Sequence, residues 1–208
     1  MTVVFDELTH TYRNEAGELF PSVTQLVAPL GDDYDEPDEM MESVLDYATE
    51  RGITMHAYLA HRLAGGDEDD FELPSAYLSY ADAVEKFLAE HSIDPLLIEY
   101  PLGGDGFAGT PDLVCIFDGT EAILDYKFVS SVSKSKVGAQ LAGYACLCRS
   151  NGIHPEALFA VQFLRDGTYR LYPIGEQAAR NAFELCRAVY ETKNRKHPRG
   201  RIFEEDEQ

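Results

Sequence analysis

The stretch over residues 109–144, GTPDLVCIFDGTEAILDYKFVSSVSKSKVGAQLAGY, constrains the fold most, because it combines apolar strand patterns with charged side chains. Its pattern predicts a hairpin, with Asp112 near the start of the first strand and residues 122–128 as the second. At the strand period of two residues, Asp125 and Lys127 point to the same face of that second strand. Burying such charges is costly unless they are paired or bind a metal. A divalent cation is therefore the natural compensation.

The rest of the chain alternates between helical and strand-like periodicities. Before the hairpin, we expect a small strand hairpin over residues 3–17 and a short helix over residues 21–28, capped by Ser22. An acidic loop over residues 31–39 follows. Two helices come next, one over residues 40–63 that is interrupted near Gly52 and one over residues 77–88. A strand precedes the hairpin. After it come a helix capped by Ser135, a second hairpin and a last helix. These elements are expected over residues 96–102, 137–150, 157–172 and 176–194.

This order of elements predicts an α+β fold of sandwich-like layers, in which a mixed central sheet is flanked by helices. The length fits a single domain over residues 1–208 with a substantial core. Within it we expect a mainly helical N-terminal elaboration, a core and a tail, over residues 1–94, 95–195 and 196–208.

Composition limits the cellular setting. The sequence has no run of about 18 apolar residues, so no membrane span is expected. The N-terminal residues lack the features of a signal peptide, which favours a cytoplasmic protein. The four cysteines are then expected to be reduced core thiols, since their spacing matches neither a zinc site nor a cluster framework; they are Cys115, Cys146, Cys148 and Cys186.

The net charge of -20 is unevenly distributed. Residues 1–128 carry 5 Lys and Arg against 28 Asp and Glu, whereas residues 129–208 carry 12 against 9. An acidic chain is a poor general binder of nucleic acid, because neutralising phosphates supplies most non-specific affinity. The basic residues that follow the hairpin are therefore the ones that could meet an anionic partner. They could equally be solvated cations at helix ends.

Three short motifs occur in order along the core. Pro111-Asp112, Asp125-Tyr126-Lys127 and Gln140-x-x-x-Tyr144 together resemble the PD-(D/E)XK nuclease superfamily. The Gln140-x-x-x-Tyr144 pattern on a helix resembles more narrowly its RecB-like and phage-type exonuclease branch. The resemblance covers roughly residues 95–165 and implies a restriction-endonuclease-like fold.

The resemblance assigns roles to the charged residues of the hairpin. Asp112 and Asp125 would ligate Mg²⁺ or Mn²⁺, and the backbone carbonyl of Tyr126 would add a third ligand. Lys127 would position or polarise the attacking water and offset charge in the transition state. The alternative is a buried pair of Asp125 and Lys127 that binds no metal.

Two more residues match positions of the same family. Glu99 corresponds to an acidic position before the Pro-Asp motif, with a catalytic or metal-binding role; otherwise it is a solvent-facing residue of an edge strand. His56 lies in an Arg-Gly-x-x-x-His helix start, where the histidine would ligate the metal; otherwise it is a packed core residue.

The helix after the hairpin would carry the DNA contacts. Gln140 and Tyr144 lie one turn apart on one helix face. In the family that face borders the active site and touches the DNA strand; otherwise it only packs on the sheet. Lys134 and Lys136, expected in the preceding loop, would reach phosphates beside the site.

These expectations point to a metal-dependent DNA exonuclease of the phage recombination or RecB-like type, that is, a deoxyribonuclease using Mg²⁺ or Mn²⁺ in DNA recombination and repair. Its substrate would be linear duplex DNA or single-stranded ends, and a homo-oligomer and a recombination partner protein are both compatible with the resemblance. A structure-specific endonuclease on the same fold is the first alternative. A catalytically idle interaction module is the second: the intact set of Asp112, Asp125 and Lys127 argues against it, and the heavy negative charge argues for it.

Overall fold

A computed structural model of the chain describes residues 2–6, 9, 11–31 and 39–194, and for residues 39–45 it describes the backbone alone. The acidic loop expected over residues 31–39 lies almost entirely outside this part, as does the tail over residues 196–208. Among the described residues, no helix combines the length and the apolar character that crossing a membrane requires.

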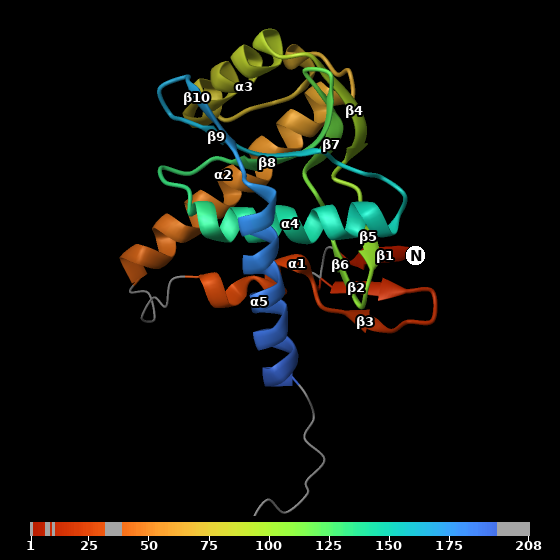
Figure 1. Ribbon diagram of the computed structural model, residues 1–208. Coiled ribbons are helices and arrows are strands. Elements are labelled where there is room, and N and C mark those ends of the chain that lie inside the picture. The colour runs from red at the N-terminus through yellow and green to blue at the C-terminus, as the bar shows by residue number, and fades with distance from the viewer. Residues whose placement is uncertain (1, 7–8, 10, 32–38, 195–208) are drawn as a thin grey trace, which may run out of the picture.

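The centre of the molecule is a five-stranded sheet (Figure 1). Its strands lie in the order β10, β9, β8, β7, β4, and they span Tyr169–Pro173, Ala157–Phe163, Thr120–Lys127, Leu113–Phe117 and Ile93–Ile98. All neighbours are antiparallel except β8 and β9, which run parallel. A parallel pair needs a long crossover, and the helix α4 (Lys134–Ser150) provides it. The predicted α+β fold with a mixed central sheet flanked by helices is confirmed, and it is consistent with a restriction-endonuclease-like arrangement.

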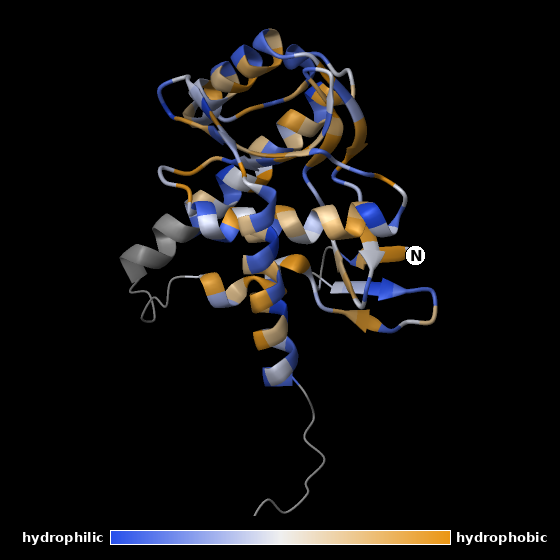
Figure 2. Cartoon of the chain, viewed as in Figure 1, coloured by the Kyte–Doolittle hydropathy of each residue, from blue (hydrophilic) through white to orange (hydrophobic). Residues whose placement is uncertain are grey.

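Helices cover the two faces of this sheet. On one face α4 packs on the sheet, and α5 (Glu176–Asn194) and the short helix α1 (Val23–Leu26) pack against α4. The other packs against α2 (Glu39–Leu63) and α3 (Leu78–Glu90). Apolar residues fill the middle of α4, which is covered on most of its surface (Figure 2). The sheet is thus the central layer between two groups of helices.

The two faces of β8 follow from its alternation. Ile123 packs in the cluster on the α4 side, whereas Leu124 and Tyr126 pack in the cluster on the α2 and α3 side. Since side chains alternate along a strand, Asp125 and Lys127 share the face of Ile123. The charges of β8 therefore point toward the layer that contains α4.

Two smaller sheets lie below the central one in Figure 1. One consists of β1 (Val3–Asp6), β2 (Thr11–Asn14) and β3 (Leu19–Phe20), and the other of β5 (Leu102–Gly104) and β6 (Phe107–Gly109). A single bridge between Ser22 and Ala108 connects these regions. The strand hairpin predicted over residues 3–17 corresponds to β1 and β2, and β3 adds a third strand to it. Short 3₁₀ turns complete the fold at Ala28–Leu30, Glu68–Asp70 and Ser75–Tyr77.

Three predicted boundaries were wrong. α2 continues through Gly52 without a break, because a helical glycine costs only about 1 kcal/mol relative to alanine and the helix is held by its neighbours. α4 begins at Lys134 after Ser133, three residues before the expected start, so Ser135 is not its cap. Lys134 and Lys136 consequently lie in the first turn of a helix and not in a loop.

The third wrong boundary concerns the strand before the hairpin. It was expected over residues 96–102, but β4 starts at Ile93 and ends at Ile98, with an irregularity between Pro95 and Leu97. Glu99 therefore follows the strand and does not belong to it. Similarly, Asp112 directly precedes β7 and is not part of that strand.

Candidate active site

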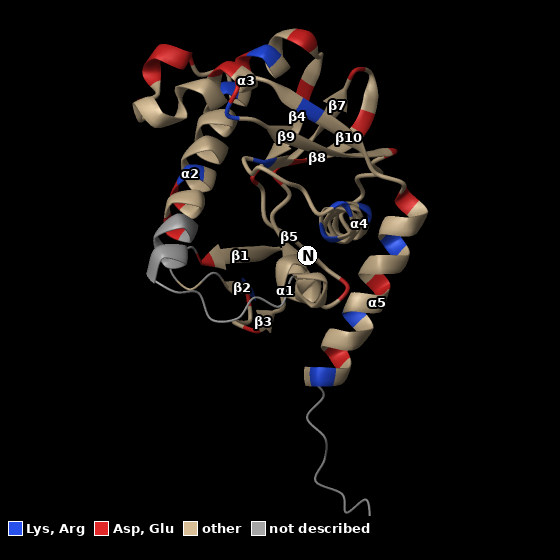
Figure 3. Ribbon diagram, turned by 90° about the vertical axis from the view of Figure 1, so that its left-hand side faces the viewer, with Lys and Arg blue, Asp and Glu red and all other residues tan. Residues whose placement is uncertain are grey.

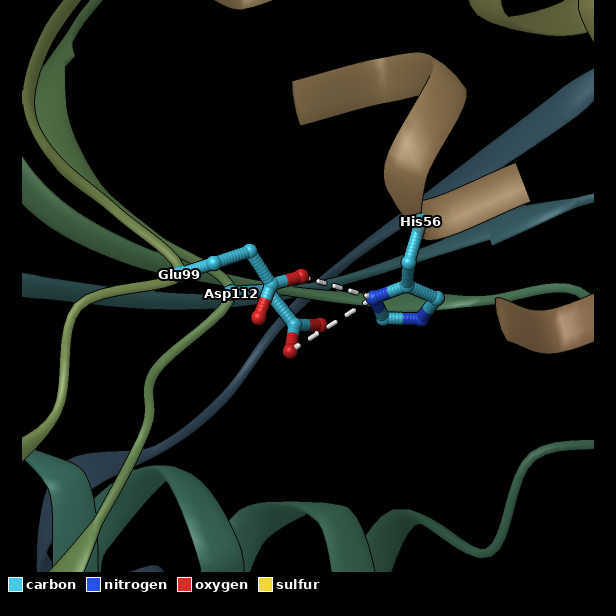
Figure 4. Close-up of side chains that lie close together, drawn as sticks. All are labelled: His56, Glu99 and Asp112. Atoms are coloured by element: carbon cyan, nitrogen blue, oxygen red, sulfur yellow. Dashed lines mark hydrogen bonds and ion pairs between the residues drawn. The ribbon is translucent and has the colours of Figure 1, made fainter. Parts of the chain in front are cut away.

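Three separate elements bring His56, Glu99 and Asp112 together (Figure 4). His56 projects from α2, Glu99 comes directly after β4, and Asp112 comes directly before β7. β4 and β7 are antiparallel neighbours, so the end of one strand lies beside the start of the other. The backbone N–H of Glu99 donates a hydrogen bond to the carbonyl of Asp112 at 3.0 Å, which extends this pairing by one step.

The ligand atoms of these three residues all lie within 4.8 Å of one another. Nδ1 of His56 is 3.1 Å from Oε1 of Glu99 and 3.7 Å from Oδ1 of Asp112. The side chain of Asp112 is 11% exposed and that of Glu99 is 38% exposed, so the group is buried on one side and open on the other. A small cation could enter this group from solvent.

The backbone at Glu99 is unusual. Its φ is 45°, in the left-handed region that non-glycine residues rarely adopt. This conformation turns the chain sharply out of β4 and places the Glu99 carboxylate beside Asp112. Left-handed backbone costs a residue with a Cβ about 1–2 kcal/mol, which the surrounding structure has to offset.

Asp125 and Lys127 form the second half of the site, on β8. Asp125 is fully buried, and its Oδ2 lies 2.5 Å from Nζ of Lys127, whose side chain is 25% exposed. Neither carboxylate oxygen of Asp125 accepts a well-formed hydrogen bond from any described residue. Buried carboxylates normally saturate their oxygens, whereas Oδ2 has only the Lys127 ammonium beside it and Oδ1 has no partner among the described residues, so a further partner is called for.

Asp112 connects the two halves. Its Oδ2 accepts a hydrogen bond from the backbone N–H of Tyr126 at 2.7 Å, while its Oδ1 faces His56. Asp125 is not part of the close group formed by His56, Glu99 and Asp112. The structure therefore places His56, Glu99 and Asp112 in one close group and leaves Asp125 outside it, on β8. The hydrogen bond from Tyr126 to Asp112 connects β8 to that group.

Burial and neighbouring charges shift the pKa values of these groups. Burial raises the pKa of Asp125 to about 6 and also raises that of Asp112, although neighbouring cations oppose both shifts. Burial lowers the pKa of His56, but the charge of Asp112 and the hydrogen bond to Glu99 outweigh it and raise the pKa to about 9. The site thus holds protons that a divalent cation would replace.

Lys127 is held in its charged form. Burial lowers its pKa, but the negative charges of Asp125 and Asp112 outweigh this effect, so the pKa of Lys127 is raised above its ordinary value. Its side chain as a whole is 25% exposed. A cation in that position can donate hydrogen bonds to water or to an anionic oxygen.

Gln140 and Tyr144 line the α4 side. Nε2 of Gln140 donates a hydrogen bond to the Tyr144 hydroxyl at 3.0 Å. Burial raises the pKa of Tyr144, and the charges of Asp112 and Asp125 add to this. Gly109 makes room for the Tyr144 ring, because a Cβ there would lie 2.8 Å from that ring.

Lys134 and Lys136 point toward different neighbours. Nζ of Lys134 lies 4.8 Å from the centre of the Tyr172 ring. Nζ of Lys136 lies beside Gly31, at 3.6 Å from where a Cβ of that residue would be. Neither lysine forms an ion pair with the carboxylates of the site in the part of the chain that the structure describes.

Sequence reasoning missed two polar residues near the site. The hydroxyl of Tyr12, on β2, bonds to Oγ1 of Thr110 at 2.8 Å. Burial is the main cause that raises the pKa of Tyr12, and the charge of Glu99 contributes. Only the alternation of a short strand marked it, and such alternation is not specific.

Gln162 is the other missed residue, and it pairs with Lys127 in the β8–β9 register. It is 1% exposed, its Nε2 donates to the carbonyl of Val129 at 2.8 Å, and its Oε1 accepts from the Tyr172 hydroxyl at 3.0 Å. These bonds fix the segment that leaves β8 directly after Lys127. A glutamine within an apolar strand was the only signal in the sequence.

No family model matches the chain, and no curated protein matches it. Among solved structures, the chain is similar to an alkaline exonuclease, LHK-Exo, from Laribacter hongkongensis, with 14% identity and a TM-score of 0.37 over 84% of this chain and 91% of that one. The structure of LHK-Exo in complex with dAMP gives 14% identity and a TM-score of 0.35 over 85% and 92%. The structure of SSO0001 gives 18% identity and a TM-score of 0.31 over 68% and 71%. At these values the likeness decides nothing about activity, which has to be judged from the site itself.

Proposed function

We propose that this chain is a divalent-metal-dependent nuclease that hydrolyses phosphodiester bonds of DNA. The observation that carries the proposal is the meeting of His56, Glu99 and Asp112 beside the buried pair of Asp125 and Lys127. Carboxylates and one imidazole around an open position form a donor set for a hard divalent ion, and an adjacent ammonium suits an anionic substrate.

The donor set fits Mg²⁺ or Mn²⁺. Asp125 has two buried oxygens with unused acceptor capacity, and the three residues of the close group present their ligand atoms toward one another. Asp112, Asp125 and His56 would hold the ion, with Glu99 and the carbonyl of Tyr126 as further donors. When bound, such an ion binds phosphate oxygens and lowers the pKa of its water.

The residues of the chain would then act in distinct ways. Lys127, oriented by Asp125, would donate hydrogen bonds to the attacking water or to an oxygen of the phosphate as charge builds up. His56 would release its proton to solvent on becoming a ligand. Tyr144 and Gln140 would form the wall of α4 against which the strand lies.

Within this class we propose an exonuclease of the RecB-like or phage recombination type, acting on linear duplex DNA or single-stranded ends. This finer assignment follows from the Gln140-x-x-x-Tyr144 pattern and the His56 motif. A cytoplasmic location, a homo-oligomer and a recombination partner protein stay predictions of the same kind. A structure-specific endonuclease would use the same residues, so the two differ only in the ends that they require.

An idle interaction module is disfavoured by the energetics of Asp125. The charged form of this buried carboxylate is penalised even with Lys127 beside it, since burial raises its pKa to about 6. A chain that only bound a partner elsewhere would gain from an apolar or amide side chain at this position.

Digestion of end-labelled linear duplex and of closed circular DNA tests the proposal. With Mg²⁺ or Mn²⁺, the linear duplex should be degraded and the closed circle should stay intact, and excess EDTA should stop the reaction. Cleavage of the closed circle would replace the exonuclease with the endonuclease. Full activity in excess EDTA, or full activity of Asp112→Asn, would overturn the metal-dependent mechanism.

A further inference from the structure

A groove of about 690 Å³ opens beside the candidate active site. It lies between α2, α3, the segment after β8 and the turn between β9 and β10, and its lining includes Arg51, Tyr80, Val129, Arg165 and Arg170. We call it the arginine groove. Its volume falls in the range of about 300–1,000 Å³ that is usual for ligand sites.

The arginines of this groove are poorly neutralised. Nε of Arg51 is buried without a hydrogen-bond partner among the described residues, and its guanidinium lies 5.8 Å and 5.3 Å from the ring centres of Tyr47 and Tyr80. Arg165 and Arg170 are exposed and form no ion pair with any residue in the described part of the chain. Asp166 also lines the groove; its carboxylate accepts hydrogen bonds from Thr168, and the charge of Arg170 helps to lower its pKa, so it offsets part of the positive charge there.

This concentration of positive charge contrasts with the chain as a whole. The net charge is -20, so most of the surface repels a polyanion. Screening over about 10 Å at 0.1 M salt makes the local potential decisive. Three arginines facing one acidic side chain therefore mark a place where an anionic strand can bind.

The arginine groove lies near the metal-binding residues, although none of them lines it. Arg51 and His56 lie five residues apart on α2, which is about 7.5 Å along the helix axis. The Phe128 ring lies between the two regions, 5.6 Å from the His56 ring and 6.1 Å from the Tyr80 ring. Val129, whose carbonyl is fixed by Gln162, follows directly and lines the groove.

We propose that the arginine groove binds the phosphodiester backbone of the DNA strand that is cleaved at the metal centre. The proposal rests on the proposed function and names the surface along which the substrate reaches that site. Arginine suits the role because its planar guanidinium binds phosphate oxygens in pairs. Tyr47, which is 44% exposed, offers a ring face for a base.

The groove explains the approach of DNA better than Lys134 and Lys136 do. Lys134 packs on the Tyr172 ring and Lys136 lies near Gly31, so the two ammonium groups do not converge on one path. Arg51, Arg165 and Arg170 come from different elements and line one groove. The strand would therefore enter over the turn between β9 and β10.

Fluorescence anisotropy with a labelled single-stranded oligothymidylate in EDTA tests the proposal without hydrolysis. The variant Arg165→Gln/Arg170→Gln should bind about 10- to 100-fold more weakly than the parent chain, and its salt slope should fall by about 1.4 because each lost single-strand phosphate contact removes about 0.7. Both side chains are exposed, so the fold should survive, which thermal melting will check.

The matched control is Arg180→Gln/Lys193→Gln. It removes the same charge from exposed positions of α5, which lies on the other side of the molecule from α2 and carries interleaved charges (Figure 3). This variant should bind the oligonucleotide within about twofold of the parent, as expected for distant screened charges. An equal loss in both variants would mean that only net charge matters, and the groove would be rejected.

The remaining outcomes separate the groove from the proposed function. If the parent does not bind the oligonucleotide, or if the groove variant binds like the parent with the same salt slope, the groove proposal is wrong even where metal-dependent hydrolysis is observed. If only Lys134→Gln/Lys136→Gln weakens binding, the strand enters along α4 and the groove is again excluded. If the groove variant alone loses binding but no divalent metal supports hydrolysis, the groove stands and the proposed function falls.

Discussion

Two carboxylate–cation pairs in this molecule differ sharply in how their oxygens are used. Glu85 on α3 pairs with Arg62 on α2: its Oε1 accepts hydrogen bonds from the Tyr58 hydroxyl at 2.6 Å and from Nε of Arg62 at 2.7 Å, and its Oε2 accepts one from Nη2 of Arg62 at 2.7 Å. Asp125 on β8 pairs with Lys127 alone, and its oxygens accept no well-formed hydrogen bond from the described residues.

The pKa shifts of the two carboxylates run in opposite directions. The hydrogen bonds from Arg62 are the main cause that lowers the pKa of Glu85, so its charged form is favoured in the fold. Burial raises the pKa of Asp125 to about 6 despite Lys127, so its charged form is penalised. Both oxygens of Glu85 are hydrogen-bonded, so this pair is a structural contact. The oxygens of Asp125 have only Lys127 as a partner among the described residues, as expected of a site that binds a cation from solution.

The largest effect that this comparison predicts is on turnover. Asp125→Asn should lower metal-dependent hydrolysis at least about 10³-fold, because it removes a charged ligand at the point where phosphate charge is neutralised. The rate of digestion of end-labelled duplex measures this loss. Glu85→Gln is the matched control, and its rate should stay within about twofold of the parent, as usual for a change away from the site.

Asp125→Asn should not weaken the metal-free fold. Since the folded-state pKa of Asp125, about 6, lies above its ordinary value of 3.8, the charged carboxylate destabilises the fold at neutral pH. Urea unfolding in EDTA should therefore give Asp125→Asn a stability equal to or above that of the parent. A clear loss of stability would make the pair with Lys127 a structural contact like that of Glu85.

Lys127→Ala should lower turnover roughly 10²-fold while metal affinity is largely retained, because the ammonium group acts on the reacting oxygens and not on the ion. Calorimetric titration with Mn²⁺ and single-turnover hydrolysis measure the two quantities separately. Collapse of metal affinity with unchanged turnover of the loaded protein would instead assign Lys127 to holding Asp125 in place.

Glu85→Gln should lower the free energy of unfolding by about 1–3 kcal/mol, since it breaks hydrogen bonds between charged partners. The folded-state pKa of Glu85 is lowered, so its contribution is present above the ordinary value of 4.5 and is lost as the pH falls through the lowered value. Urea unfolding across this range should show parent and variant converging in acid. A difference that persists at low pH would point to packing rather than charge.

The last prediction concerns the pH dependence of metal binding. His56 has a pKa of about 9 without metal, so a metal ion has to displace its proton at any lower pH. The apparent affinity for Mn²⁺ should fall about tenfold per pH unit below 9, and more steeply below about 6, where Asp125 also takes up a proton. Calorimetry in buffers of different ionisation enthalpy counts the protons released. His56→Gln should bind more weakly but lose the dependence between pH 7 and 9.

The central fold could be predicted because its signals are local. The alternation of β8 placed Asp125 and Lys127 on one face, and Asp118 and Gly119 marked the turn before them. Element boundaries were harder. The first turn of α4 contains Lys134 and Lys136 and no apolar periodicity, so nothing in the sequence distinguished Ser133 from Ser135 as the residue that precedes the helix.

The site shows the same division between local and long-range information. A family resemblance pointed to His56, Glu99 and Asp112, and the structure brings them together. It could not tell that Asp125 lies outside this close group, because that depends on the geometry between β8 and the end of β4. The arginine groove joins residues more than a hundred positions apart, and no single stretch of the sequence contains its pattern.

The left-handed backbone at Glu99 places stability and activity in opposition at a single codon. Glycine adopts that conformation without the cost borne by residues with a Cβ, and every glutamate codon is one nucleotide from a glycine codon. A library selected only for thermal resistance should therefore collect glycine at position 99 and lose the carboxylate. Selection for turnover should restore glutamate, so the residue recovered there reports which demand the chain has been under.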